Sequence, residues 1–347
     1  MLHDWWVGAG GAVPPLTGDR ELALEIARLA GHRCRRVAAA TVHLDAAVPV
    51  RMAFIRADAR TLFEVGSITK AMTGMLLADV IERTELTLTS TVGQLVPSLA
   101  GSAVATVTVQ ELCTHTSGLP RLPTNPRTVV RVAKFAMLGL DPYRGITASQ
   151  VVAITGGQNL QHRGRRTYSN LGAALLGQLL AEREGVDFGV LLQQRIFTPV
   201  GMHGAGVATI QHKAAPGWSD AGLPRQPWVM DGYAPAGGVI ATIGDLARLA
   251  VALLGQTAPG YLSTAAIPGV LSARPNRRSG MFWIIDPLPA GGSMIWHNGA
   301  TGGYSSFFAL FPDTRKAVVV LANISRSADQ ERIALGLASR GDDSLAV

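Results

Sequence analysis

The sequence has few residues of the kinds that bind metals or form disulfides. Its 347 residues include only two cysteines, Cys34 and Cys113, whose separation matches no metal-binding or redox motif. One disulfide between them would be feasible, but two buried free thiols are the commoner arrangement. The eight histidines form no ligand cluster, and His203 and His212 lack the spacing of a zinc site. We therefore expect a protein that uses neither a metal nor another cofactor.

Lysine is scarce as well. Four lysines stand against 27 arginines in a chain of net charge +7. No nucleic-acid recognition motif accompanies this charge, and runs of like charge usually form a solvated face. We expect no nucleic-acid partner. The basic residues include two short clusters, which are Arg33, Arg35 and Arg36, and Arg163, Arg165 and Arg166.

Long hydrophobic runs are also absent, although hydrophobic residues make up 48% of the chain, enough for a large buried core. Residues 91–110 carry no charge but are rich in Thr, Ser and Gly, so we predict no transmembrane segment. Residues 5–18 contain Pro14-Pro15 and lack a basic leader, unlike a signal peptide. The default expectation is a cytoplasmic protein, or an exported one if the true start lies upstream. The sequence does not indicate an oligomeric state.

Two common enzyme motifs that contain serine or lysine are missing from the sequence, although it holds a reactive serine–lysine pair. No Gly-x-Ser-x-Gly elbow occurs, which excludes a conventional α/β-hydrolase, and Lys70 is followed by Ala71, which excludes a P-loop. The pair is Ser67-Ile68-Thr69-Lys70, at the start of a helix predicted to continue to Arg83. A lysine three positions after a serine lies on the same helix face, where it can help remove the hydroxyl proton. The helix N-terminus adds free N–H groups and partial positive charge.

Two further triplets follow in the chain, Tyr168-Ser169-Asn170 and His297-Asn298-Gly299. From the composition, chance gives about 0.2 Ser-x-x-Lys, about 0.09 Tyr-x-Asn and about 0.9 His-x-Gly matches, a product of about 0.016. In this order the motifs resemble those of the serine β-lactamase and penicillin-binding protein superfamily. The most similar branch contains the class C β-lactamases, the serine DD-peptidases and their esterase relatives. Residues 112–120 and 233–238 are similar to loops of that branch.

The resemblance implies a two-step hydrolysis through an acyl-enzyme, with Ser67 as the nucleophile. Lys70 and Tyr168 would share the proton of Ser67, and which of them is the general base stays open. Asn170 would orient the acyl group of the substrate and hold Lys70 by a hydrogen bond. The backbone N–H groups of Ser67 and Ala300 would form the oxyanion hole.

His297, Asn298 and Gly299 would line the substrate site, and Gly299 would let the strand approach the substrate closely. Class C β-lactamases usually carry Lys-Thr-Gly at this place. The lysine there is a fixed charge for a substrate carboxylate, whereas histidine is mostly neutral at pH 7. This departure weighs against strong β-lactamase activity. In the loop of residues 112–120 we expect His115 and Ser117 to be structural, because no partner residues mark Ser117 as a nucleophile.

Three functions therefore stay open. The first is a serine hydrolase, esterase-like, that acts on a small ester or amide. The second is a β-lactamase or a D-alanyl-D-alanine carboxypeptidase. The third is a penicillin-binding-like protein with little turnover, against which the complete set of motifs argues. Cell-wall roles require export, so the lack of a visible signal favours the first.

Periodicity and turn signals predict an α+β fold, an α/β sandwich of the β-lactamase/transpeptidase type. Short links between the late strands imply antiparallel neighbours. We expect a discontinuous sheet domain of residues 19–85 and 231–340, a mostly helical lobe of residues 86–230, an N-terminal tail of residues 1–18, and the site between the lobes. The predicted strands are 37–44, 49–55, 280–285, 293–297, 303–311 and 316–323. The predicted helices are 19–30, 71–83, 148–155, 170–183, 187–194, one from about Ile243 and one from Ser327, where Gln330 would close a capping box. Residues 211–229 are predicted to form a loop.

Overall fold

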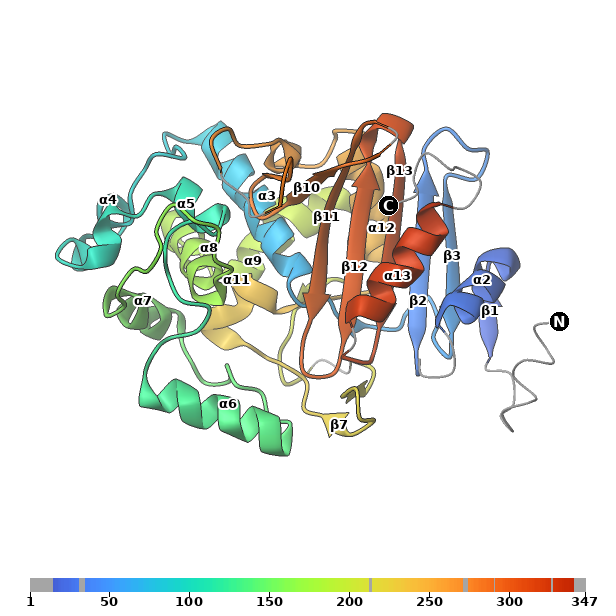
Figure 1. The fold of residues 1–347 in the computed structure, drawn as a ribbon, viewed down its shortest axis with the longest axis horizontal. Helices are drawn as coiled ribbons and strands as arrows, with labels where there is room; N and C mark the ends of the chain where they lie inside the picture. The colour runs from blue at the N-terminus through green and yellow to red at the C-terminus, as the bar shows by residue number, and fades with distance from the viewer. Residues whose placement is uncertain are drawn as a thin grey trace.

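The computed structural model describes residues 15–30, 35–211, 214–270, 274–289, 291–325 and 327–339. Its centre is an antiparallel sheet of eight strands in the order β1-β3-β2-β13-β12-β11-β10-β9, drawn as the upright arrows in Figure 1. The strands are β1 (Leu16–Gly18), β2 (Val37–His43), β3 (Val50–Ile55), β9 (Arg278–Ser279), β10 (Ile284–Pro287), β11 (Ser293–Ala300), β12 (Ser305–Phe311) and β13 (Lys316–Ala322). The predicted α+β class is confirmed.

The sheet joins the two ends of the chain because β2 pairs with β13 along its whole length. Alternate side chains of each strand enter two separate apolar clusters. On β12, Phe307 packs on one face with helices α2 (Arg20–Ala30) and α13 (Ser327–Ala338). Phe308 packs on the other face with α3 (Ile68–Arg83) and α12 (Ile243–Leu254). Five shorter strands lie outside this sheet: β4 (Phe63–Glu64), β5 (Gly206–Val207), β6 (Gly217–Trp218), β7 (Pro224–Arg225) and β8 (Val239–Ala241).

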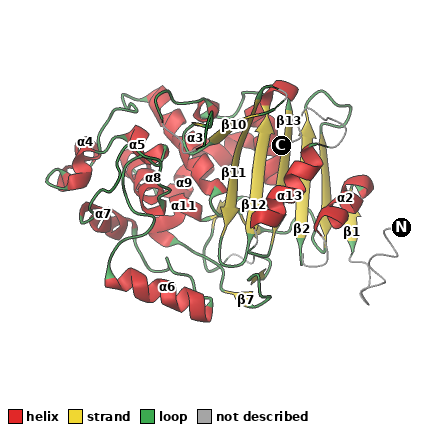
Figure 2. Cartoon of the chain, viewed as in Figure 1, coloured by secondary structure: helices red, strands yellow, loops and turns green. Residues whose placement is uncertain are grey.

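The helices gather at one end of the sheet and on both of its faces, as Figure 2 shows in red. They are α2 (Arg20–Ala30), α3 (Ile68–Arg83), α4 (Val92–Leu95), α5 (Val109–Cys113), α6 (Pro126–Leu138), α7 (Ala148–Gly156), α8 (Asn170–Glu184), α9 (Phe188–Leu192), α10 (Thr198–Val200), α11 (Ala234–Gly237), α12 (Ile243–Leu254) and α13 (Ser327–Ala338). A π-turn, Gln193–Phe197, links α9 to α10, and 3₁₀ turns lie at Pro97–Leu99, Ala103–Thr106, Asp231–Tyr233, Tyr261–Thr264 and Pro312–Thr314. None of the helices in the described residues is both long and apolar enough to cross a bilayer.

Two helices, α3 and α8, are apolar on nearly all sides because they form the centre of the molecule. Thirteen of the sixteen residues of α3 are buried, and eleven of the fifteen residues of α8 are buried. Such helices show little amphipathic periodicity, since every face meets protein. Together they carry the serine and the asparagine of the predicted site at their N-termini.

Several predicted elements differ from the structure. The tail was predicted to reach residue 18, but Leu16–Gly18 pair with β3 as an edge strand, too short to show alternation in the sequence. The strand predicted at 280–285 is β10, Ile284–Pro287, because Phe282 takes a left-handed φ of 63° and donates its N–H to Cys113. The predicted loop 211–229 contains the β6–β7 hairpin.

The other details concern caps, cysteines and domain limits. The predicted capping box depends on the Ser327 side chain, which lies outside the described part of the chain; the Gln330 side-chain oxygen accepts a hydrogen bond from Ser305 at 2.7 Å. Cys113 is a buried free thiol, whereas Cys34 lies outside the described residues. The domain limits at 85/86 and 230/231 stay a prediction, because a single apolar cluster contains side chains from both sides of them.

Candidate active site

The serine and lysine of the first motif lie on one face of the start of α3. Ser67 is the N-cap residue of this helix, with φ −67° and ψ −5°. Lys70 Nζ lies 3.1 Å from Ser67 Oγ. The helical spacing of three residues produces this contact directly. The hydroxyl therefore has a nitrogen base within hydrogen-bonding reach.

The Lys70 ammonium would be poorly stabilised where the side chain lies. The side chain is fully buried, and Nζ donates to the Ala236 carbonyl at 2.5 Å. Burial first, and the positive charge of Arg121 second, hold the pKa of Lys70 well below its usual value. A lowered pKa favours the neutral amine, the form that can accept a proton from Ser67.

Tyr168 brings a second proton carrier to the same oxygen from a distant part of the chain. Its hydroxyl donates to Ser67 Oγ at 2.6 Å, and Lys70 Nζ lies 4.7 Å from the centre of its ring. Burial raises the pKa of Tyr168 to about 12. The phenol is therefore protonated at neutral pH, and the structure brings the predicted three residues together.

Glycines let strand β11 press against the start of α3. A methyl group at Gly299 would lie 2.0 Å from the Val65 carbonyl oxygen and 3.0 Å from the Ser67 nitrogen. A methyl group at Gly66, which has a φ of +53°, would lie 2.8 Å from the Ala300 nitrogen. The backbone N–H groups of Ser67 and Ala300 thus lie at the junction where the oxyanion hole is predicted.

His297 is buried, and its Nδ1 lies 2.6 Å from the Asn298 carbonyl oxygen. Burial, reinforced by Lys70, lowers the pKa of His297 to about 3. This histidine is therefore neutral and supplies no fixed charge. Strand alternation turns the Asn298 side chain to the opposite sheet face, so its predicted role in binding stays a prediction.

Asn170 departs from its predicted contact. Its amide nitrogen donates to the Tyr143 hydroxyl at 3.0 Å, and among the described residues it has no hydrogen bond to Lys70. The Ala236 carbonyl holds Lys70 instead. The Asn170 side-chain oxygen is buried without a partner, which leaves it available to a donor on a substrate.

Comparison of the sequence with known proteins identifies its family. The sequence profile of the family described as Beta-lactamase matches residues 24–340. The chain belongs to the beta-lactamase family. Its relatives are serine hydrolases, and this member is a serine hydrolase as well.

A β-lactamase of Escherichia coli strain K12 is 27% identical to this hydrolase over 307 residues, which cover 76% of each chain. The unguisins hydrolase ungD' of Aspergillus campestris is 26% identical over 320 residues, which cover 79% of this chain and 55% of the relative. A solved class C β-lactamase superposes with a TM-score of 0.77 at 20% identity, covering 93% of this chain and 97% of its own. The last likeness shows the fold, and it confirms the predicted β-lactamase/transpeptidase type.

Two further residues contact Tyr168 in this family member: His115, which the sequence analysis expected to be structural, and Arg121, which it missed. The ring of His115 lies 4.6 Å from the Tyr168 ring, and its Nδ1 accepts the Ser169 N–H at 3.2 Å. The guanidinium of Arg121 lies 5.5 Å from the Tyr168 ring centre. The backbone oxygen of Arg121 accepts the N–H of Asn170. The sequence signal for both residues was the resemblance of residues 112–120 to a loop of the family. This loop contains His115, and Arg121 directly follows it.

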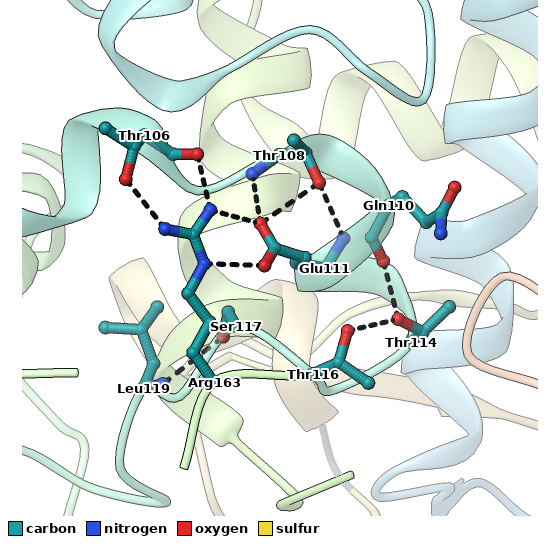
Figure 3. Close-up of polar contacts among 9 residues, drawn as sticks. All are labelled: Thr106, Thr108, Gln110, Glu111, Thr114, Thr116, Ser117, Leu119 and Arg163. Carbon is teal, nitrogen blue, oxygen red and sulfur yellow. Dashed lines mark hydrogen bonds and ion pairs between the residues drawn. The ribbon is translucent and has the colours of Figure 1, made fainter. Parts of the chain in front are cut away.

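An ion pair away from the reacting atoms fastens the loop that leads to Tyr168 (Figure 3). Arg163 binds the Glu111 carboxylate through two nitrogens at 2.6 and 2.7 Å, and it also binds both oxygens of Thr106. Glu111 in turn caps α5 by accepting the Thr108 N–H at 2.8 Å. Arg163 therefore serves the structure of this loop.

Ser169, the middle residue of the second motif, makes two structural hydrogen bonds. Its hydroxyl accepts the Gly172 N–H at 2.9 Å as the N-cap of α8 and donates to the Pro120 carbonyl at 2.7 Å. Ser117 is buried, and its hydroxyl accepts the Leu119 N–H at 3.3 Å. Ser169 thus ties the three-residue motif to α8 and to the loop of residues 112–120, which limits where Tyr168 can point.

Proposed function

We propose that the protein hydrolyses small ester or amide substrates through an acyl-enzyme formed on Ser67. Lys70 acts as the general base, because a buried amine with a lowered pKa, 3.1 Å from the hydroxyl, can take its proton. As Ser67 Oγ bonds to the substrate carbonyl carbon, the carbonyl oxygen becomes an oxyanion that accepts from the N–H groups of Ser67 and Ala300.

Tyr168 then passes a proton to the leaving group. Its hydroxyl already contacts Ser67 Oγ at 2.6 Å, and the proton it gives is replaced by the one held on Lys70. The bond from carbonyl carbon to leaving group breaks, and an alcohol or amine departs. Water, deprotonated by the same pair, attacks the acyl carbon and restores the Ser67 hydroxyl.

The preference for neutral esters or amides rests on one observation, the burial of His297, which disfavours a positive charge on its ring. The side chain is buried, and its pKa is lowered to about 3. A substrate carboxylate would therefore meet no fixed charge at this strand. A relative named for unguisins rather than for β-lactams is consistent with a substrate outside the β-lactams.

A second candidate function, β-lactamase or D-alanyl-D-alanine carboxypeptidase, is favoured by Arg121. Its guanidinium lies beside Tyr168 and has no ion pair among the described residues. Class C β-lactamases usually have a lysine where this chain has His297. Arg121 could bind a substrate carboxylate as that lysine does.

Parallel substrate assays test the proposal. The protein is incubated with p-nitrophenyl acetate, p-nitrophenyl butyrate, a chromogenic cephalosporin and a D-Ala-D-Ala peptide, and the trapped acyl adduct is located by mass spectrometry. We expect ester turnover to exceed cephalosporin and peptide turnover, with the adduct on Ser67. Ser67→Ala should abolish the ester turnover and the adduct, whereas Ser117→Ala should keep both of them. Faster cephalosporin or peptide turnover would support the second candidate, and an adduct on another serine would reject both.

A further inference from the structure

Helix α6 exposes an unusual share of the apolar surface of the molecule. None of its thirteen residues is buried. Eleven large hydrophobic side chains are exposed among the described residues, and six of them lie on α6 or directly after it. These six are Val129, Val130, Val132, Met137, Leu138 and Leu140. An apolar cluster of this density marks an interaction surface rather than scattered surface residues.

The apolar side chains form a stripe that faces away from the protein. Val129 and Met137 are spaced i and i+8, so they lie on one side of the helix. Val132, at i+3, stands at the edge of this stripe, beside the cavity beneath the helix. The opposite side holds Phe135, whose ring packs edge-on against Trp228 at 5.6 Å. In Figure 1 the helix stands at the lower edge of the molecule, clear of the sheet. The stripe is therefore a ridge open to solvent.

Hydrogen bonds at both ends and along the inner side fix the helix in this position. The Asn125 side chain caps the N-terminus by accepting the Thr128 N–H at 2.9 Å, and Gly139 ends the helix in a left-handed conformation. The Arg131 guanidinium donates to the backbone oxygens of Pro142 and Arg144 at 3.3 and 2.7 Å. The stripe is thus held outward by the fold.

The charges on this helix are all of one sign. Residues 126–140 contain Arg127, Arg131 and Lys134 but no aspartate or glutamate. Arg127 and Lys134 are exposed and have no ion pair among the described residues. A second copy of the chain seated on the stripe would bring these cations against each other, since no acidic group on the helix can pair with them. An anionic surface complements both the stripe and its charged edge.

We propose that α6 is an interfacial helix that seats its apolar stripe on an anionic lipid surface. A single convex ridge of valine, methionine and leucine with basic residues beside it has the composition of helices that lie in the headgroup region. A folded acidic protein would need a groove to receive the ridge, whereas a bilayer deforms around it. Beneath the inner side of α6 lies a cavity of about 630 Å³ lined in part by Tyr143, the partner of Asn170. Docking would place the lipid on the side of the molecule that holds this pair.

Vesicle co-sedimentation of the full chain tests the proposal. The vesicles are phosphatidylcholine alone, or phosphatidylcholine mixed with phosphatidylglycerol. We expect binding to the mixed vesicles that weakens with added salt, and a loss on the order of tenfold or more in Val129→Asp/Met137→Asp and in Arg127→Glu/Lys134→Glu. Ile210→Asp is the matched control, because Ile210 and Met137 are both 73% exposed; it should bind like the unchanged protein.

Circular dichroism and hydrolysis of a soluble ester show that each variant remains folded, since none of these residues contacts Ser67. The proposal is overturned if the unchanged protein ignores both kinds of vesicle or binds them equally. It is also overturned if the stripe variants bind as well as Ile210→Asp. Light scattering that finds a dimer of the unchanged protein, lost in the stripe variants without any lipid binding, would assign the stripe to self-association instead.

Discussion

At the scale of single residues, burial shifts the pKa of each group around Ser67. Desolvation lowers the pKa of Lys70 and raises that of Tyr168. These opposite shifts support the proposed division of roles, with the amine as base and the phenol as acid. The sequence could supply the residue types and their order, but it could not supply the burial that produces the shifts.

The first residue-scale prediction concerns pH. Because the pKa of Lys70 is held well below its usual value, the amine loses its proton at a lower pH than an ordinary lysine does. Ester hydrolysis should therefore fall as the pH drops through this lowered pKa and stay level above it. Stopped-flow measurement of acylation against pH checks this. Lys70→Ala should lose on the order of 10²-fold to 10⁴-fold in acylation rate, and Lys316→Ala should not. A rate that still climbs steeply between pH 8 and the usual lysine pKa would contradict the assignment.

His115 provides the second prediction, as a positioning residue for Tyr168. It accepts the Ser169 N–H and packs on the Tyr168 ring, with its backbone at a φ of +61°. His115→Asn keeps an acceptor and tolerates this backbone, so it should remain stable within about 1 kcal/mol while kcat falls and KM changes little. His115→Phe keeps a ring but leaves the Ser169 N–H unpaired, at a cost of about 1–3 kcal/mol in unfolding free energy. Equal kcat for His115→Asn and the unchanged enzyme would reduce His115 to a structural residue, as the sequence alone suggested.

Glu64 provides the third prediction. Its buried carboxyl accepts the Trp228 N–H at 2.9 Å, and burial raises its pKa to about 7. In the unfolded chain the carboxyl ionises near its ordinary pKa of 4.5. Between these values the folded state holds the extra proton, so this group makes the protein less stable as pH rises from 4.5 to 7 and has no further effect above 7. Urea unfolding at pH 5 and pH 8 should show that Glu64→Gln removes up to about 3 kcal/mol of this difference. An unchanged pH dependence in Glu64→Gln would refute the raised pKa.

At the scale of elements, strand β11 and helix α3 meet without side chains between them. The sequence predicted the helix and most strands well, because apolar periodicity and caps are local. It misplaced β10 and did not single out α6 or β1. A left-handed turn at Phe282 and the pairing of Leu16–Gly18 with β3 are set by distant backbone partners, which no local pattern records.

The contact between β11 and α3 gives the fourth prediction. A methyl group at Gly299 would lie 2.0 Å from the Val65 oxygen, and one at Gly74, further along α3, would lie 2.1 Å from the Met281 oxygen. Both Gly→Ala changes should lower the melting temperature, since backbone must move in each case. Only Gly299→Ala should displace the N–H groups of the proposed oxyanion hole, with a loss in kcat of about 10²-fold. If Gly74→Ala lost kcat equally, the effect would belong to α3 as a whole and not to the oxyanion hole.

At the scale of the whole molecule, the site depends on chain segments that are far apart in sequence. Ser67 and Tyr168 are 101 residues apart, and His297 comes from the last part of the sheet. Three short motifs predicted this meeting because their order resembles that of a family. Nothing in the sequence predicted Tyr143 beside Asn170, Ala236 holding Lys70, or Arg121 near Tyr168. Each of these contacts joins residues that are far apart in the sequence.

One apolar cluster joins the sheet to the helical segment, and this gives the fifth prediction. Phe308 and Val319 of the sheet belong to the same buried cluster as Leu175 and Leu176 of α8. Neither part can lose its core without exposing that of the other, so the two should unfold in one transition. Urea unfolding should give the same midpoint by far-ultraviolet circular dichroism and by tryptophan fluorescence. Leu176→Ala in the helical segment and Val319→Ala in the sheet should each move both midpoints together. Leu176→Ala should lower the free energy of unfolding by about 2–5 kcal/mol. Separate midpoints, or a variant that shifts only one signal, would mean that the two parts fold independently and that the site forms only when they dock.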